Sequence, residues 1–114
     1  MSKKRNDRIY EKHADLCKML ANPTRLEIID ELTEGEKSVG DLVSSIEIRQ
    51  ANLSQHLAEM RKRNLLETRK EGAKVYYSLA FPEIVDACNL IQKILFKQLS
   101  REKKLLEGGE ENEK

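Results

Sequence analysis

Two short amphipathic segments joined by a tight connection are the feature that most constrains the fold of this 114-residue chain. The first covers residues 38–46 and opens with Ser38 and Asp41 in the pattern of a capping box, with Asp in the usual place of Glu. The second runs from about Gln50 to Arg63, with Leu53, Leu57 and Met60 at helical spacing on one face. Two such helices with only residues 47–49 between them predict a helix-turn-helix.

Helices are also predicted on the N-terminal side of this pair. Apolar residues recur at helical spacing from about Arg8 to Leu20. Asn22 and Pro23 then supply an N-cap and a proline at the first helical position, where its missing N–H costs nothing. The second helix should end at Gly35.

The segments on the C-terminal side predict a hairpin and a long helix. Leu65–Lys70 and Lys74–Leu79 read as strands around a turn at residues 71–73. After Pro82, a helix should run to about Leu106, before Gly108 and Gly109. The expected fold is therefore mainly α-helical with a small β-hairpin, a winged helix-turn-helix.

The composition of the chain indicates a single domain and favours burial of apolar surface against a second copy. There are no repeats and no internal linker, so we expect one domain over residues 1–107 and a disordered acidic tail over residues 108–114. A hydrophobic content of 39% is modest for a self-sufficient core. The apolar stripe of the last helix is wider than one small domain needs, which favours burial against a second copy.

Targeting and redox signals point to the cytoplasm. No stretch approaches the roughly 20 apolar residues that cross a bilayer, and the N-terminus has no signal-peptide pattern, so no membrane partner is expected. Cys17 and Cys88 are too few for a disulfide scaffold and are not spaced as CxxC. A reducing compartment is the default for such a chain.

Positive charge is concentrated in the middle of the sequence. The net charge is only +1, yet Arg49–Lys74 contains seven Lys or Arg residues against three Glu. Such a segment suits a polyanion, although a charged segment is also the ordinary solvated face of a helix. Both interpretations are open on charge alone.

Uncharged polar side chains on the segment 50–63 favour DNA as the polyanion. If its apolar face docks on the core, amides, a hydroxyl and an imidazole lie largely on its flanks and outer face, and such groups can bond to base edges in a major groove. The expected contacts to bases or nearby backbone are Gln50, Asn52, Ser54, Gln55 and His56. Phosphate contacts are expected from Arg61, Lys62, Arg63, Arg69, Lys70 and Lys74. Alternatively, the polar face is merely solvated and the basic run complements the helix C-terminus.

Three motifs, in a fixed order along the chain, are more specific than a helix-turn-helix pattern alone. NPTRLEII, SVGDL and LSQHLAEMRKRNLLETRKEGAKVYYSL together resemble the ArsR/SmtB family of winged-helix transcriptional repressors, closely over about Leu20 to Leu79. The resemblance implies a homodimer formed through the first and last helices. It also implies release of operator DNA by an inducer in many members.

Two positions depart from the family pattern. Glu47 stands where the turn commonly has Gly, and Arg49 stands where the recognition helix commonly starts with Ser or Thr. A missing N-cap costs about 1 kcal/mol. Arg49 could instead reach a phosphate.

The usual metal sites of the family are not expected here. Ser38 and Gly40 occupy the positions of thiolate ligands in the family motif, and they cannot replace soft sulfur. The positions of the second site correspond to Phe81, Glu83, Ile94 and Lys97, of which only Glu83 could ligate. No cofactor is therefore predicted.

Cys17 and Cys88 remain as candidate sensor residues on the two expected interface helices. Buried structural thiols, a redox or reactive-sulfur switch, and a soft-metal or arsenite site that includes His13 are three open interpretations. His13 by itself is better explained as a packed interface residue.

The sequence and the family resemblance together predict a sequence-specific, homodimeric DNA-binding repressor, with thiol chemistry at Cys17 and Cys88 as one candidate modulator of operator binding. A winged-helix module that binds an acidic protein is the rival from another class. An enzyme is disfavoured, since no phosphate-binding glycine loop, paired catalytic carboxylates or activated nucleophile is recognisable.

Overall fold

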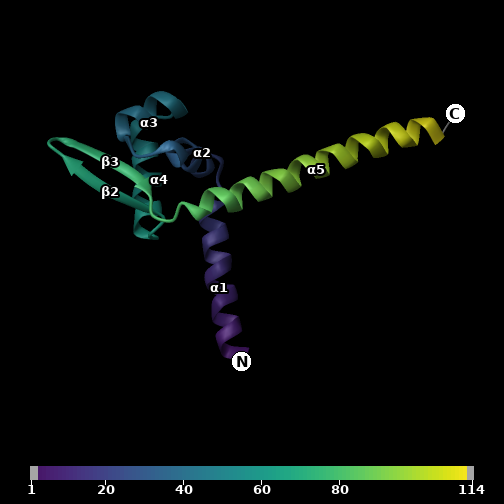
Figure 1. Cartoon of the computed structure of the whole chain (residues 1–114), viewed down its shortest axis with the longest axis horizontal. Helices are drawn as coiled ribbons and strands as arrows, with labels where there is room; N and C mark the ends of the chain where they lie inside the picture. The colour runs from purple at the N-terminus through teal and green to yellow at the C-terminus, as the bar shows by residue number, and fades with distance from the viewer. Residues whose placement is uncertain (1–2, 113–114) are drawn as a thin grey trace. The chain divides into compact units, whose positions relative to one another are not determined.

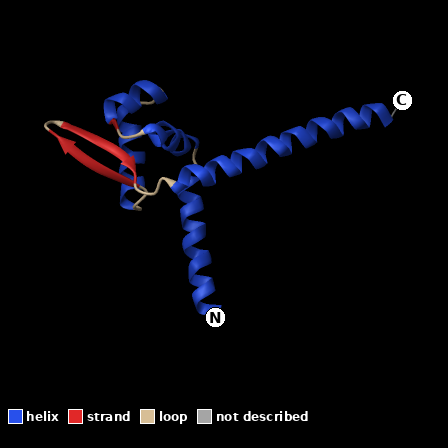
Figure 2. Cartoon of the chain, viewed as in Figure 1, coloured by secondary structure: helices blue, strands red, loops and turns tan. Residues whose placement is uncertain are grey.

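A computed structural model describes residues 3–112 (Figure 1). Its elements are α1 (Lys3–Leu20), α2 (Pro23–Glu31), the 3-10 helix η1 (Leu32–Glu34), β1 (Lys37–Ser38), α3 (Val39–Ile46), α4 (Gln50–Lys62), β2 (Leu66–Glu71), β3 (Lys74–Leu79) and α5 (Glu83–Asn112). The chain divides into two compact units between Pro82 and Glu83. The first contains α1 to β3, and the second is α5. The mainly helical fold with a small hairpin is as predicted (Figure 2).

The helix starts follow from local capping chemistry. The backbone N–H of Arg25 donates to Asn22 Oδ1 at 3.1 Å, and Pro23 occupies the first position of α2. At α3, the N–H of Asp41 donates to Ser38 Oγ at 3.2 Å, and the N–H of Ser38 donates to Asp41 Oδ2 at 3.3 Å. Both predicted caps are confirmed, because each depends only on residues within one turn.

The core of the first unit lies among α2, α3 and α4. Its fully buried large side chains are Ile28, Leu42, Leu53, Leu57 and Met60. Three of these come from α4, as its apolar spacing predicted. One face of α4 is therefore fixed against the core, which determines which side chains the opposite face presents.

The sheet has one strand more than the predicted hairpin. β2 and β3 pair antiparallel as the predicted hairpin, but Glu71 pairs with Lys74, so the turn is residues 72 and 73 rather than 71–73. β1 pairs with the other edge of β3, with Lys37 opposite Tyr77, so the strand order is β1-β3-β2. A strand of only two residues has no alternating pattern to read, which is why the sequence did not reveal β1. β1 thereby joins the hairpin to the residues that lead into α3.

The last helix is longer than predicted. α5 continues through Gly108 to Asn112, so its expected end near Leu106 is wrong, and the tail expected to be disordered is helical as far as Asn112. Glycine in a helix costs only about 1 kcal/mol relative to alanine, which weakens a helix without ending it. Residues 113 and 114 lie outside the described residues, and a single domain over 1–107 stays a prediction. Within the described part of the chain, no helix is long and apolar enough to span a membrane.

Replacing Glu47 by glycine is expected to stabilise the protein. Glu47 ends α3 in the left-handed conformation, with φ 56° and ψ 52°. This conformation costs a side chain with a Cβ about 1–2 kcal/mol, and glycine avoids the cost. We expect Glu47→Gly to raise the free energy of unfolding by about 1 kcal/mol in urea titrations.

Asn64 provides the matched control for this change. It also has a positive φ, 63°, but asparagine tolerates the left-handed region better than glutamate does. Asn64→Gly should therefore gain less than Glu47→Gly. A Glu47→Gly protein no more stable than the parent would show that the turn at Glu47 is not strained.

Candidate nucleic-acid interface

Helix α4 separates a buried face from an open one. Leu53, Leu57 and Met60 are 0% exposed. Gln50, Asn52, Ser54 and Gln55, four of the five predicted reading residues, are exposed. Arg49 occupies the N-cap position, and its side chain makes no capping hydrogen bond. The first turn of α4 thus leaves backbone N–H groups open to an external acceptor, such as a phosphate oxygen.

His56 differs from the other four reading residues. It is half-buried, and its Nδ1 accepts a hydrogen bond of 3.1 Å from Arg25 Nε. Burial, followed by the charge of Arg25, lowers the pKa of His56. His56 therefore lies on a flank of α4, where α2 is close enough to contact one edge of the imidazole.

Most of the predicted phosphate contacts are exposed. Arg61 and Lys62 lie in the last turn of α4, where cations also complement the helix dipole. Lys70 and Lys74 lie near the tip of the β2–β3 hairpin, which in Figure 1 extends beyond α3 and α4. These four side chains are available on two separate elements. Such placement allows one DNA duplex to be contacted at two points along its backbone.

Arg63 is exposed, but it also lines a depression on the side of α1. The depression has a volume of about 230 Å³ and is lined by Lys12, Asp15, Leu16, Met19 and Arg63. Arg63 ends α4 as its C-cap. It is thus shared between the end of α4 and α1, unlike the freely projecting Arg61 and Lys62.

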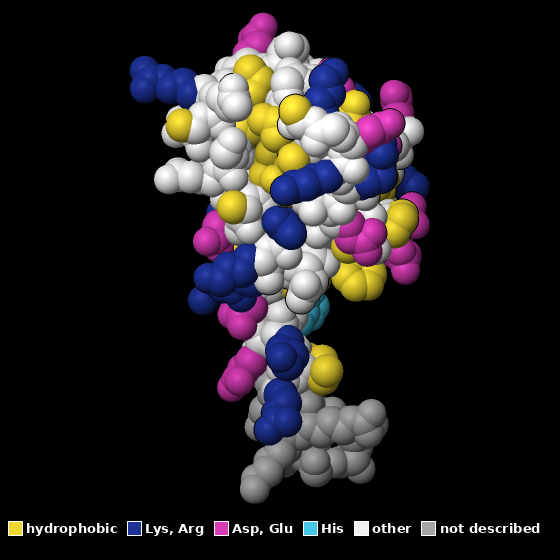
Figure 3. All heavy atoms as spheres, turned by 90° about the vertical axis from the view of Figure 1, so that its left-hand side faces the viewer, with side chains coloured by type: hydrophobic (Ala, Val, Ile, Leu, Met, Phe, Trp, Pro, Cys, Tyr) yellow, Lys and Arg dark blue, Asp and Glu magenta, His cyan; other side chains and the backbone are white. Residues whose placement is uncertain are grey.

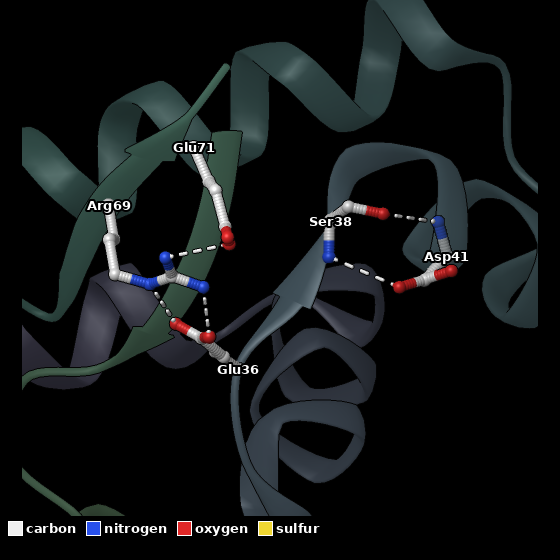
Figure 4. Close-up of polar contacts among 5 residues, drawn as sticks. All are labelled: Glu36, Ser38, Asp41, Arg69 and Glu71. Carbon is white, nitrogen blue, oxygen red and sulfur yellow. Dashed lines mark hydrogen bonds and ion pairs between the residues drawn. The ribbon is translucent and has the colours of Figure 1, made fainter. Parts of the chain in front are cut away.

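Arg69 is engaged within the protein (Figure 4). Its Nε donates to Glu36 at 3.1 Å, its Nη1 donates to Glu71 at 3.0 Å, and the guanidinium lies 4.8 Å from the ring centre of Tyr76. The hydrogen bond from Arg69 lowers the pKa of Glu36. The same bond, with that to Glu71, raises the pKa of Arg69. Two carboxylates therefore compete with any phosphate for Arg69.

Charge on the face seen in Figure 3 is mixed. Lys and Arg side chains are interspersed there with Asp and Glu, and hydrophobic side chains gather in the upper part. Arg69 pairs with two carboxylates, those of Glu36 and Glu71. The contribution of a cation to polyanion binding therefore depends on whether a carboxylate already neutralises it.

The two thiols lie in different units. Cys17 is exposed on α1, and Cys88 is half-buried on α5, where burial raises the pKa of its thiol. His13, the weak third candidate, is exposed one turn before Cys17. Among the described residues, no group of three or more His, Cys, Asp or Glu side chains could hold a metal ion. A raised pKa reduces the thiolate fraction of Cys88. Cys17 is the more accessible of the two thiols because its side chain is exposed.

Two residues of this region were not predicted as functional. Arg25 and Glu36 contact His56 and Arg69 from positions 31 and 33 residues away in the sequence. No helical or strand periodicity connects residues at such separations. The one local signal was Arg25 itself, a charged residue in the first turn of α2.

Comparison with known proteins places these features in a family. Residues 22–68 match the family described as bacterial regulatory protein, arsR family. The HTH-type transcriptional regulator Rv0081 of Mycobacterium tuberculosis is 35% identical over 100 residues, which cover 87% of this chain and 88% of Rv0081. The transcriptional activator HlyU of Vibrio cholerae is 42% identical over 79 residues, 69% of this chain and 73% of HlyU.

Solved structures agree with the sequence matches. The crystal structure of Rv0081 has a TM-score of 0.74 at 34% identity and covers 82% of this chain and 94% of that chain. The homodimeric winged helix-turn-helix DNA-binding domain Mb0332 of Mycobacterium bovis has a TM-score of 0.75 at 28% identity, and the match covers 89% of this chain and 93% of that domain. With the exposed polar face of α4 and the hairpin beside it, these matches show that the chain belongs to the arsR family of winged-helix, DNA-binding transcriptional regulators.

Proposed function

We propose that this regulator is a homodimeric repressor that recognises a partly palindromic operator through α4. The observation that carries the proposal is the division of α4 into a fully buried apolar face and an exposed face of amide and hydroxyl groups. Uncharged donors and acceptors add little to non-specific attraction. They do discriminate base edges, to which Asn and Gln can bond bidentately at adenine.

In this proposal, the exposed cations bind the phosphates of the DNA backbone. Arg61, Lys62, Lys70 and Lys74 bind phosphates, and Arg49 does so at the start of α4. Arg63 contributes from the edge of the depression on α1. Arg69, which was predicted as a phosphate contact, is instead assigned to holding the hairpin, because Glu36 and Glu71 already pair with it.

Dimer formation is supported by exposed apolar side chains on α5. Leu90, Ile91, Ile94, Leu95, Phe96 and Leu99 are each between 47% and 67% exposed. A contiguous apolar helix face of this kind is typical of a protein–protein interface. The relative Mb0332 is homodimeric, and we assign the same state to this chain, formed through its first and last helices. Two recognition helices would then enter major grooves about one helical turn apart.

Thiol chemistry is proposed as the modulator of operator binding. Cys17 is exposed on α1 and Cys88 lies on α5, the two helices assigned to the interface. A solved relative is described as reduced HlyU, which distinguishes a redox state in that protein. Oxidation or persulfidation of Cys17 and Cys88 would alter the interface and, through it, the spacing of the recognition helices. Since its target is DNA, we place the protein in the cytoplasm.

Gel-shift titration against the promoter of its own operon tests operator recognition. We expect the reduced protein to bind this DNA at least tenfold more tightly than a scrambled duplex at moderate salt, with two chains per duplex. Gln55→Ala should reduce this preference, because a base contact is lost while the phosphate contacts remain. Equal affinity for both duplexes would contradict operator recognition and favour a module that binds an acidic protein partner.

The same titration with oxidised, persulfidated and metal-treated protein tests the thiol proposal. We expect oxidation or persulfidation to weaken operator binding in the parent. The Cys17→Ser, Cys88→Ser double variant should not respond. A response in that variant equal to the parent's would overturn the thiol proposal. If the parent responds to a soft metal alone and the double variant does not, the same cysteines form a metal site.

A further inference from the structure

Arg25 connects two helices that differ in function. It lies in the first turn of α2, where its own N–H is held by the Asn22 cap. From there, its side chain reaches α4, where Nε donates to His56 Nδ1 at 3.1 Å. Its Nη1 donates to the carbonyl oxygen of Met19, in the last turn of α1, at 3.3 Å. The guanidinium is thus oriented by α1 while it contacts the reading helix.

The chemistry of this contact fixes the protonation of His56. A guanidinium has only donors and does not lose its proton in proteins, so Nδ1 of His56 must offer a lone pair. A neutral imidazole with a free lone pair at Nδ1 carries its proton at Nε2. The burial of His56 disfavours the doubly protonated cation, and the charge of Arg25 acts in the same direction.

The other edge of His56 reaches solvent. Among the described residues, no buried side-chain nitrogen or oxygen lacks a hydrogen-bond partner. The hydrogen bond of His56 uses Nδ1, so Nε2 is at an accessible position. Asn52 lies one turn earlier on the same face of α4 and is exposed. His56 therefore lies one helical turn from Asn52, one of the amides assigned to base reading.

We propose that Arg25 is a positioning residue for DNA recognition: its bond to Nδ1 holds His56 in the Nε2–H tautomer, so that His56 presents only a hydrogen-bond donor to DNA. The inference rests on the proposed function of α4. A group that can only donate pairs with acceptors, such as purine N7, guanine O6, thymine O4 or a phosphate oxygen. It does not pair with the amino groups of adenine or cytosine. Arg25 thereby restricts which DNA atoms His56 can contact.

The tautomer can be measured on the free protein. The chain has two histidines, so His13→Gln leaves His56 as the single source of imidazole signals. Nitrogen-15 NMR of this variant near pH 7.5 should show a neutral His56 protonated at Nε2. A proton at Nδ1, or a charged imidazole at that pH, would overturn the inference whatever the protein does with DNA.

A double-mutant cycle tests whether Arg25 acts through His56. Arg25→Met should reduce the preference for operator over scrambled DNA about fivefold, the loss expected for one hydrogen bond to a base edge. In a His56→Ala background, Arg25→Met should cause no further loss of this preference. In a His56→Gln background, where the side chain keeps a hydrogen-bond donor at its tip, the preference for operator DNA should be largely retained. Arg8→Met removes the same charge from an exposed position on α1 and is the control.

The outcomes separate the possible roles. If affinity for both duplexes falls equally in Arg25→Met and His56→Ala, the acceptor is a phosphate rather than a base. If Arg25→Met lowers the preference as much in the His56→Ala background as in the parent, Arg25 does not act through His56 and the inference fails. If the parent itself does not prefer the operator, the proposed function fails, and this role of Arg25 with it.

Discussion

Leu57→Ala is expected to lower the free energy of unfolding by about 3 to 5 kcal/mol, the range for a fully buried leucine in a close-packed core. Leu57 is 0% exposed and comes from the centre of α4. Its removal costs the transfer energy of the deleted atoms and leaves a cavity among residues that cannot collapse freely. The measurement is urea denaturation followed by circular dichroism at one protein concentration.

Leu26→Ala is the matched control for this change. Leu26 lies on α2 and is 40% exposed, so truncation removes less buried surface and opens no enclosed cavity. Its expected loss is about 1 kcal/mol. If the two variants lost equal stability, α4 would not be docked on the core through Leu57, and the assignment of its opposite face to DNA would lose its physical basis.

Neutralising four exposed cations should produce the largest change in DNA affinity. Arg61→Gln, Lys62→Gln, Lys70→Gln and Lys74→Gln together remove up to four phosphate contacts per chain. Each contact contributes about 0.9 to the slope of log affinity against log salt. Near physiological salt, we therefore expect a loss of roughly 100- to 1000-fold, similar for operator and scrambled DNA, and a shallower salt dependence by fluorescence anisotropy.

Two neighbouring residues of β2 provide an internal comparison for this prediction. Lys70 is exposed, whereas Arg69 is paired with Glu36 and Glu71. Lys70→Gln should therefore weaken DNA binding more than Arg69→Gln does at the same salt concentration. The reverse order would show that Arg69 leaves its carboxylates to contact DNA, which would restore it as a phosphate contact.

Local patterns account for the part of the fold that the sequence predicted. The caps at Asn22 and Ser38, the apolar stripe of α4 and the two strands of the hairpin are each defined by residues within a few positions of one another. Short-range hydrogen bonding and side-chain periodicity determine such features. The elements of the candidate site were therefore predictable, together with the exposure of four of the five residues proposed to contact bases.

Contacts between distant residues account for what the sequence did not predict. His56 is constrained by Arg25 and Arg69 by Glu36, each across more than thirty positions, and β1 is too short to show any pattern. The boundary of α5 was missed for another reason. Glycine is a weak helix breaker, so Gly108 gave no dependable stop.

The hairpin is held near the middle of its strands by contacts that are complete before any ligand arrives. Arg69 ties β2 to Glu36, just ahead of β1, and β1 itself pairs with β3. These contacts restrict the conformational freedom of the hairpin before DNA binds. Lys70 and Lys74 can then meet a duplex with a small entropic penalty, so the wing should contribute to fast, reproducible engagement rather than slow adaptive wrapping.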